Sequence, residues 1–194
     1  MRSVWTRVCI LCFVALAIGA CTSGAPVRLP GAVVDPMAEA FEWSAARPLT
    51  WADFQGRPEL MSGAAALSAY VISYDTECTG RTFVPRVVSR FLPKISWVKS
   101  QHLMNLASAQ ILQHEQTHFD VSEVQARRAR QELLALPSPC DLSEKDFDRM
   151  FNAFGQRDAD IQQQYDRETA HGTNVRAQNQ WQSRVEQWLR TLPQ

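Results

Sequence analysis

Five consecutive residues, His114-Glu115-Gln116-Thr117-His118, follow the pattern H-E-x-x-H. In an α-helix, residues four positions apart lie about 40° from alignment, so both imidazoles can bind one metal ion. Glu115 adjoins the first histidine without being a ligand, and its carboxylate can take a proton from a water that the metal activates. The pattern predicts a Zn²⁺ site with Glu115 as general base. The alternative is a pair of hydrogen-bonded core histidines.

The third ligand of such a site is expected from outside the helix that carries the motif. Asp120 and Glu123 point about 200° and 140° away from His118 around the helix. His102 lies about 18 Å from His114 along the helix axis. None of these three side chains can readily join the two histidines, so another element of the chain is needed.

The run Y-D-R-E-T-A-H-G at residues 165–172 supplies the candidates for the third ligand. His171, the one histidine left, is the first choice, and Asp166 is the second. His171 could instead interact with the dipole at a helix C-terminus. Tyr165 could stabilise the oxyanion of the reaction, although it fits equally well into an apolar helix stripe.

Two segments rich in β-branched and aromatic residues, 66–76 and 82–91, predict strands joined by a tight turn. Pro85 has no N–H to donate and places the second strand at an edge or a bulge. Shorter strands are expected at residues 95–98 and within residues 41–54.

The rest of the chain has helical periodicity. No proline or glycine interrupts residues 100–135, where apolar residues recur on one helix face. A second helix is expected after Ser143, with Asp146 completing a capping box, and Gly172 as its C-terminal cap. A third amphipathic stretch carries Trp181. The predicted fold class is α+β, with a small mixed or antiparallel sheet packed on the long H-E-x-x-H helix and two further helices.

The N-terminus resembles an export signal. Arg2 and Arg7 precede an uncharged run at residues 8–20, which is too short for a transmembrane helix and fits a signal peptide. Small residues directly before Cys21 resemble a bacterial lipobox, which implies cleavage before Cys21 and lipidation of its sulfur. The alternative is a conventional signal peptide, and both interpretations export the protein.

This interpretation divides the chain into three segments. Residues 1–20 are the signal peptide, residues 21–38 are the lipidated cysteine and a tether rich in proline and glycine, and residues 39–194 are the folded domain. Thr22, which is not acidic, resembles the residue after the lipid cysteine in outer-membrane lipoproteins. We therefore expect an exported cell-envelope lipoprotein, in the outer membrane or facing the periplasm, that contacts the membrane through Cys21.

Export also affects which cysteines remain in the mature protein and whether they form a disulfide. Cys9 and Cys12 leave with the signal peptide, so Cys78 and Cys140 remain beside the lipidated cysteine. An oxidising compartment favours a disulfide between them, and the alternative is two separate buried thiols.

Composition excludes several other classes. The chain has 194 residues, of which 45% are hydrophobic and 21% charged, which excludes intrinsic disorder and a polytopic membrane protein. Lys plus Arg and Asp plus Glu each number 20, so the basic excess of a nucleic-acid-binding protein is missing. Oligomeric state does not follow from composition.

Several motifs together resemble one bacterial family. They are H-E-Q-T-H-F-D, Y-D-R-E-T-A-H-G, Gln178 and Trp181, the upstream L-T-W-A-D-F-Q-G-R-P at residues 49–58, and Ser96-Trp97. This set, spread over about residues 40–185, is similar to the "domain of unknown function 922" family, described as predicted secreted Zn-dependent proteases. The resemblance implies a zincin-like fold, in which a mixed sheet covers the H-E-x-x-H helix.

The resulting hypothesis is a lipid-anchored zinc peptidase of the bacterial cell envelope that hydrolyses peptide or protein substrates. A strand edge beside the site could hold an extended peptide. The alternative is a non-catalytic envelope lipoprotein whose metal site is structural or vestigial and whose surface binds a partner. A third hypothesis is a metal-dependent amidase that acts on cell-wall peptides.

Overall fold

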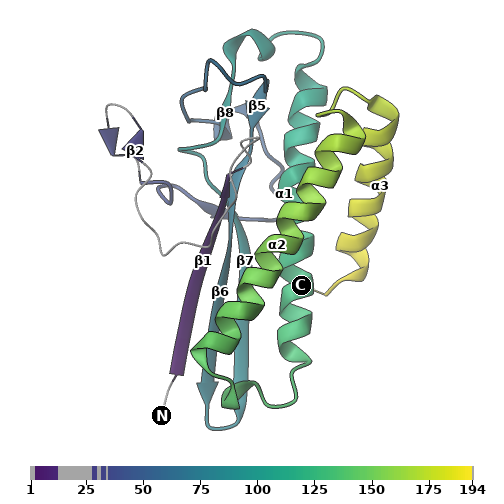
Figure 1. The fold of residues 1–194 in the computed structure, drawn as a ribbon. Coiled ribbons are helices and arrows are strands. Elements are labelled where there is room, and N and C mark those ends of the chain that lie inside the picture. Colours follow the sequence, from purple (N-terminus) through teal and green to yellow (C-terminus); the bar gives the residue numbers. More distant parts are fainter. Residues whose placement is uncertain (1–2, 13–27, 30–31, 34, 194) are drawn as a thin grey trace.

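The computed structural model describes residues 3–12, 28–29, 32–33 and 35–193 (Figure 1). The strands are β1 (Ser3–Cys12), β2 (Arg28–Leu29), β3 (Ala32–Val33), β4 (Phe41–Glu42), β5 (Ala66–Leu67), β6 (Ala69–Thr79), β7 (Thr82–Phe91) and β8 (Trp97–Val98). The helices are α1 (Ser108–Leu134), α2 (Glu144–Thr169) and α3 (Val175–Thr191). Strands precede helices along the chain, so the predicted α+β class is confirmed.

The main sheet is antiparallel, with strand order β1-β6-β7-β4. Its centre is the β6–β7 hairpin, whose register runs from Tyr70 opposite Phe91 to Thr79 opposite Thr82. Gly80 has a φ of 63° and forms the tight turn. The two strands predicted from β-branched and aromatic residues are therefore confirmed, and residues 97–98 form the short strand expected nearby, paired with β5.

The helix that carries H-E-x-x-H begins later than its periodicity predicted. Residues 100–102 form a single 3₁₀ turn, and α1 starts only at Ser108. The backbone N–H of Lys99 donates to Ala65 O, and its ammonium donates to Ser62 O, which holds this segment beside the loop before β5. Leu103 lies between this turn and the start of α1, and it is 39% exposed.

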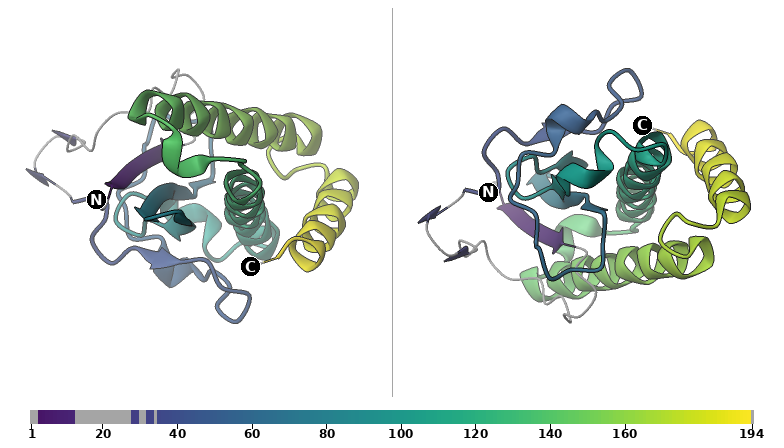
Figure 2. Two further views of the ribbon diagram at one scale, coloured as in Figure 1. Left: turned by 90° about the horizontal axis from the view of Figure 1, so that it is seen from below. Right: turned by 90° about the horizontal axis from the view of Figure 1, so that it is seen from above.

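The core lies between β6–β7 and the first two helices. Tyr74 and Val87 of the strands pack with Phe119 of α1 and Phe151 of α2 in one buried cluster. Both views in Figure 2 place α1 between the strands and α3. A second cluster, which includes Val121 and Trp181, joins α1 to α3. As a result α1 is buried along most of its length, and the side chains that face α2 and α3 are shielded from water.

The start of α2 is the one that the capping box predicted. Ser143 Oγ accepts the N–H of Asp146, and the Asp146 carboxylate accepts the N–H of Ser143. The end of α2 differs from the expectation of a glycine cap alone. Ala170, His171 and Gly172 all have positive φ, at 48°, 51° and 80°. The chain therefore reverses direction two residues before the glycine.

Gly172 is also confined by its surroundings. A Cβ added at this position would lie 2.9 Å from Cγ of His114, which is closer than real Cβ contacts. A side chain here would also strain the left-handed backbone. The turn after α2 therefore packs directly against the first histidine of the motif.

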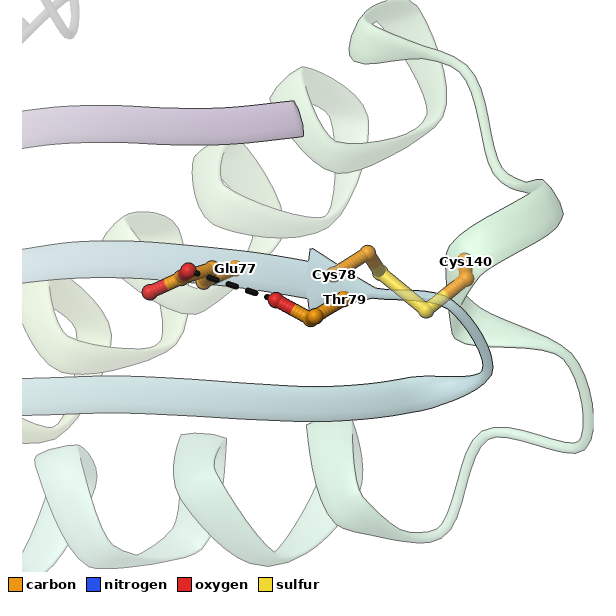
Figure 3. Close-up of a disulfide and its surroundings, with 4 residues drawn as sticks. All are labelled: Glu77, Cys78, Thr79 and Cys140. Carbon is orange, nitrogen blue, oxygen red and sulfur yellow. Dashed lines mark hydrogen bonds between the residues drawn. A yellow bond between two sulfur atoms is a disulfide. The ribbon is translucent and has the colours of Figure 1, made fainter. Parts of the chain in front are cut away.

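A disulfide joins Cys78 at the end of β6 to Cys140 in the short turn before α2, the pairing that export favoured (Figure 3). It closes a loop across 62 residues of sequence. The bond ties the tip of the β6–β7 hairpin to the start of α2, at the end of the domain away from the β5–β8 pair (Figure 1).

The N-terminal segment has an unexpected place. Residues 3–12, interpreted above as part of a signal peptide, form β1 and pair with β6 from Ser3 opposite Cys78 to Cys12 opposite Ala69. Cleavage before Cys21 would remove this strand. Cys21 and most of the expected tether lie outside the described residues, so lipidation stays a prediction. None of the helices in the described part of the chain is long and apolar enough to cross a membrane.

Candidate metal centre

His114 and His118 lie one turn apart on α1 and are both buried. Their ring centroids are 4.7 Å apart, and the two Nε2 atoms approach to 3.2 Å. This is the geometry that the four-residue spacing predicted, because both imidazoles leave the helix on the same side.

Asp166, near the C-terminal end of α2, completes the group. Its Oδ1 lies 3.2 Å from Nε2 of His114 and 3.0 Å from Nε2 of His118. The three ligand atoms all lie within 4.8 Å of one another. The structure thus brings together the two motif histidines and Asp166, which was the second choice of third ligand.

His171, the first choice, lies outside this group. Its side chain is 74% exposed, and its Nδ1 is 3.7 Å from Asp166 Oδ1. The physical reason is the end of α2. The helix stops at Thr169, and the left-handed conformation of Ala170 turns the following side chain out toward solvent. His171 is therefore a neighbour of Asp166 and not a member of the convergent set.

Two buried glutamines hold the outer nitrogens of the histidines. Gln162 Oε1 accepts from Nδ1 of His118 at 2.6 Å, and Gln178 Oε1 lies 3.2 Å from Nδ1 of His114. Both glutamine side chains are almost fully buried. Sequence reasoning missed the role of both residues. For Gln162 the signal was its four-residue spacing from Asp158 and Asp166, which places three polar groups on one face of α2.

The donor set fits a cation. Each Nδ1 faces a glutamine oxygen, which only accepts, so each Nδ1 carries the hydrogen and a neutral ring has a lone pair on Nε2. The buried Oδ1 of Asp166 has no hydrogen-bond partner, although both Nε2 atoms are close to it. Two nitrogen lone pairs and a carboxylate oxygen therefore point at one small region, and a divalent cation satisfies all three.

Without a metal, a proton takes part of this role. Burial alone would lower the pKa of His118, but the Asp166 carboxylate raises that pKa to about 9. Burial opposes ionisation of Asp166, yet the charge of His118 holds the Asp166 pKa well below its usual range. The Asp166 carboxylate therefore favours a positive charge at the position where the three side chains converge.

Glu115 lies beside the histidines and is buried. Its backbone carbonyl accepts from the Ser68 hydroxyl, which ties this turn of α1 to the segment between β5 and β6. The Glu115 carboxylate is near enough to His118 to contribute to raising that pKa. The residue expected to act as general base therefore shares the electrostatic environment of the ligands without belonging to the convergent group.

Tyr165 lies behind the His114 ring. The two rings stack with centroids 4.7 Å apart, and the Tyr165 hydroxyl donates to Gln178 Oε1 at 2.7 Å. Burial raises the pKa of Tyr165 above its usual value. Its hydroxyl is thus already engaged with Gln178, whose oxygen lies at Nδ1 of His114 and not at Nε2.

Most of the folded domain matches the sequence profile of a known family. The family is described as a bacterial protein of unknown function (DUF922), and its profile matches residues 58–172. This is more than half of the 194-residue chain, so the protein belongs to that family, and the resemblance found in the motifs is confirmed. The match includes His114, His118, Asp166 and His171, while α3 lies beyond its end. No curated protein and no solved structure matches the chain.

Proposed function

We propose that this protein is a zinc-dependent peptidase with a zincin-like fold, in which one long helix supplies two metal ligands and the general base. One arrangement carries the proposal. His114, His118 and Asp166 converge, and Glu115 adjoins the first ligand. A set of three protein ligands is typical of catalytic zinc sites, whereas structural zinc sites have four.

Each residue has a distinct part in hydrolysis. Bound Zn²⁺ would supply a Lewis acid that polarises the scissile carbonyl and lowers the pKa of a bound water. Glu115 would be the general base, whose carboxylate accepts a proton from water and passes it to the leaving amine. Asp166 supplies the one anionic ligand, which offsets part of the charge of the cation.

The burial of Tyr165 and the exposure of His171 suggest different roles for these two residues. Tyr165 orients the His114 ring and does not stabilise the oxyanion, because its hydroxyl is buried and donates to Gln178. His171 is exposed beside Asp166 and is available to contact a bound peptide.

We also propose that the protein acts in the cell envelope, anchored to a membrane through lipidated Cys21, on peptide or protein substrates. The support is the resemblance of the first 20 residues to an export signal and the Cys78–Cys140 disulfide, because disulfides persist in oxidising compartments. Acyl labelling of the wild type and of Cys21→Ser tests the anchor. Equal labelling of the two proteins contradicts it.

Zinc content tests the metal site. Purified protein is expected to hold about one zinc ion per chain by elemental analysis, as a single site requires. His118→Ala and Asp166→Ala are each expected to lose most of it. His171→Ala and His102→Ala are the matched controls, because both histidines lie outside the convergent group, and both variants should retain the metal. A wild type that holds no zinc after refolding with it contradicts the proposal.

Glu115→Gln tests catalysis separately from metal binding. The variant keeps the shape and the ligands but lacks the base, so zinc remains while hydrolysis of a peptide library falls by at least about a hundredfold. Equal hydrolysis by the two proteins contradicts Glu115 as the base.

A second candidate function is a non-catalytic binding module with a structural metal. The observation that favours it is burial, since the side chains of His114, His118 and Asp166 are only 7%, 8% and 17% exposed. Zinc whose removal unfolds the protein, together with no hydrolysis by the wild type, would support this function over the peptidase.

A further inference from the structure

We propose that Gln162 and Gln178 are positioning residues that fix the tautomer and the ring orientation of the two histidines, so that both Nε2 atoms face the metal position. The inference deepens the proposed metal site and rests on it. The two glutamines come from different helices, Gln162 from α2 and Gln178 from α3. Residues from all three helices therefore form or support the metal centre, although α3 contributes no ligand.

Gln162 holds His118 at two points. Its Oε1 accepts from Nδ1 of the ring at 2.6 Å, and its Nε2 donates to the backbone carbonyl of the same residue at 3.0 Å. A flipped amide would place its NH₂ against the Nδ1–H and its oxygen against the carbonyl oxygen, so the observed orientation is the one that satisfies both groups. The side chain has 0% exposure, so no water can replace it without rearrangement.

Gln178 holds His114 through a longer chain of contacts. Its Nε2 donates to Thr117 Oγ1 at 3.3 Å, and Thr117 Oγ1 itself donates to Gln113 O at 2.9 Å. The Thr117 hydroxyl hydrogen is therefore used, and the threonine can only accept from Gln178. This fixes the amide with Oε1 toward His114, where it also accepts from Tyr165 at 2.7 Å.

Both outer partners are neutral amides and not carboxylates. A histidine ligand needs a partner on its second nitrogen to fix its tautomer, and a carboxylate partner also adds negative charge. Here Asp166 is the one carboxylate in the convergent group. The two amides orient both rings without adding negative charge near the metal position. A cation bound there would therefore keep more of its power to polarise a substrate than it would beside carboxylate partners.

The first readout is zinc affinity of the full chain, measured by competition with a chelator. Gln162→Leu removes the acceptor, and zinc binding is expected to weaken by about 10- to 100-fold. Gln178→Leu is expected to have a smaller effect, because its contact with the ring is longer. Gln163→Leu is the matched control, since this glutamine neighbours Gln162 on α2 and is exposed; its affinity should equal that of the wild type.

The second readout needs no metal. Nitrogen NMR of the metal-free protein is expected to show a protected Nδ1–H on His118, and Gln162→Leu is expected to lose that protection. This signal persists even where the protein binds no zinc, so the positioning role and the metal site can fail separately. A Gln162→Leu variant with wild-type zinc affinity and an unchanged Nδ1–H overturns the proposal.

Gln162→Glu distinguishes positioning from packing and covers the case in which the leucine variant does not fold. Glutamate keeps an acceptor for the His118 Nδ1–H but loses the donor to His118 O, so zinc binding is expected to be weaker than in the wild type and clearly stronger than in Gln162→Leu. If Gln162→Glu folds but binds zinc no better than Gln162→Leu, the acceptor is not what matters, and the proposal is wrong.

Discussion

The two halves of α2 present one continuous face to the interior, yet they are built from opposite kinds of residue. In the first half, Phe147, Phe151 and Phe154 are buried against the strands. The Phe151 ring stacks on Tyr74 of β6 with centroids 4.8 Å apart. These contacts are apolar and depend on fit and area more than on direction.

The second half of α2 continues the same face with polar groups. Asp158, Gln162 and Asp166 follow one another at four-residue spacing and point at partners on β6 and α1. Asp158 Oδ2 accepts from the Tyr70 hydroxyl at 2.6 Å, and the other two contact the motif histidines. Because each buried polar group needs its own partner, this half specifies one arrangement of its neighbours.

The apolar half of α2 therefore contributes mainly to stability, and the polar half mainly to the metal site. Burial of the phenylalanines supplies free energy of folding, while the polar half uses part of the interior to orient ligands. Substitutions in the two halves should therefore have different signatures. Those in the apolar half should change the free energy of unfolding without changing the metal site. Those in the polar half should act through the hydrogen bonds and charges of individual buried groups, which include the ligand Asp166 and its neighbour Gln162.

The largest effect on stability is expected from Phe151→Ala. Deleting a buried phenylalanine ring leaves a cavity and costs about 3–5 kcal/mol, and Phe151 is 1% exposed. Urea unfolding measures this change. The zinc content of the remaining folded protein is expected to equal that of the wild type. Loss of zinc from folded Phe151→Ala would show that the two halves are not separable.

The disulfide is expected to have the next effect. It anchors the apolar half of α2 to the β6–β7 hairpin, and removing a native disulfide costs about 2–5 kcal/mol. The double variant Cys78→Ser/Cys140→Ser should unfold at lower urea concentration and still bind zinc. Unchanged unfolding of the double variant, beside reduced wild type as a control, contradicts this expectation.

The same division explains what the sequence could predict. Phe147, Phe151 and Phe154 recur at four- and three-residue spacing, which is the sequence pattern of an apolar helix face. The strand at residues 82–91 was predictable from its β-branched residues. His114 and His118 were predictable as a pair because a single helix fixes their separation. These features depend on local periodicity, which the sequence carries directly.

The features that were missed depend on tertiary contacts. The convergence of Asp166, and not His171, with the two histidines depends on where α2 ends. The left-handed turn begins at Ala170, a residue type that gives no signal for it. Gln162 had a sequence signal in its four-residue spacing from Asp158 and Asp166, whereas the role of Gln178 became recognisable only when α3 was known to pack beside α1. The start of α1 depended on Lys99 contacts with a loop that is distant in sequence.

The smallest net effect, and the sharpest test of the polar half, is expected from Asp158→Asn. Burial raises the pKa of Asp158 from 3.8 to about 7, and its Oδ1 has no hydrogen-bond partner. Between these two values the unfolded chain releases a proton that the folded protein keeps. The contribution of Asp158 to the free energy of unfolding therefore falls as pH rises from about 4 to 7, and is constant above.

Asparagine removes that titration but places a buried amide donor where Oδ1 has no partner, which costs about 1–3 kcal/mol at every pH. The two effects oppose each other at neutral pH, so the net change there is small, while at pH 4 the variant is less stable than the wild type. The measurement is urea unfolding of both proteins at several pH values between 4 and 8. The difference between them should shrink or reverse as pH rises. A difference that is constant across this range would mean that Asp158 is ionised in the folded protein throughout, and that the polar half of α2 accommodates a second buried charge beside Asp166.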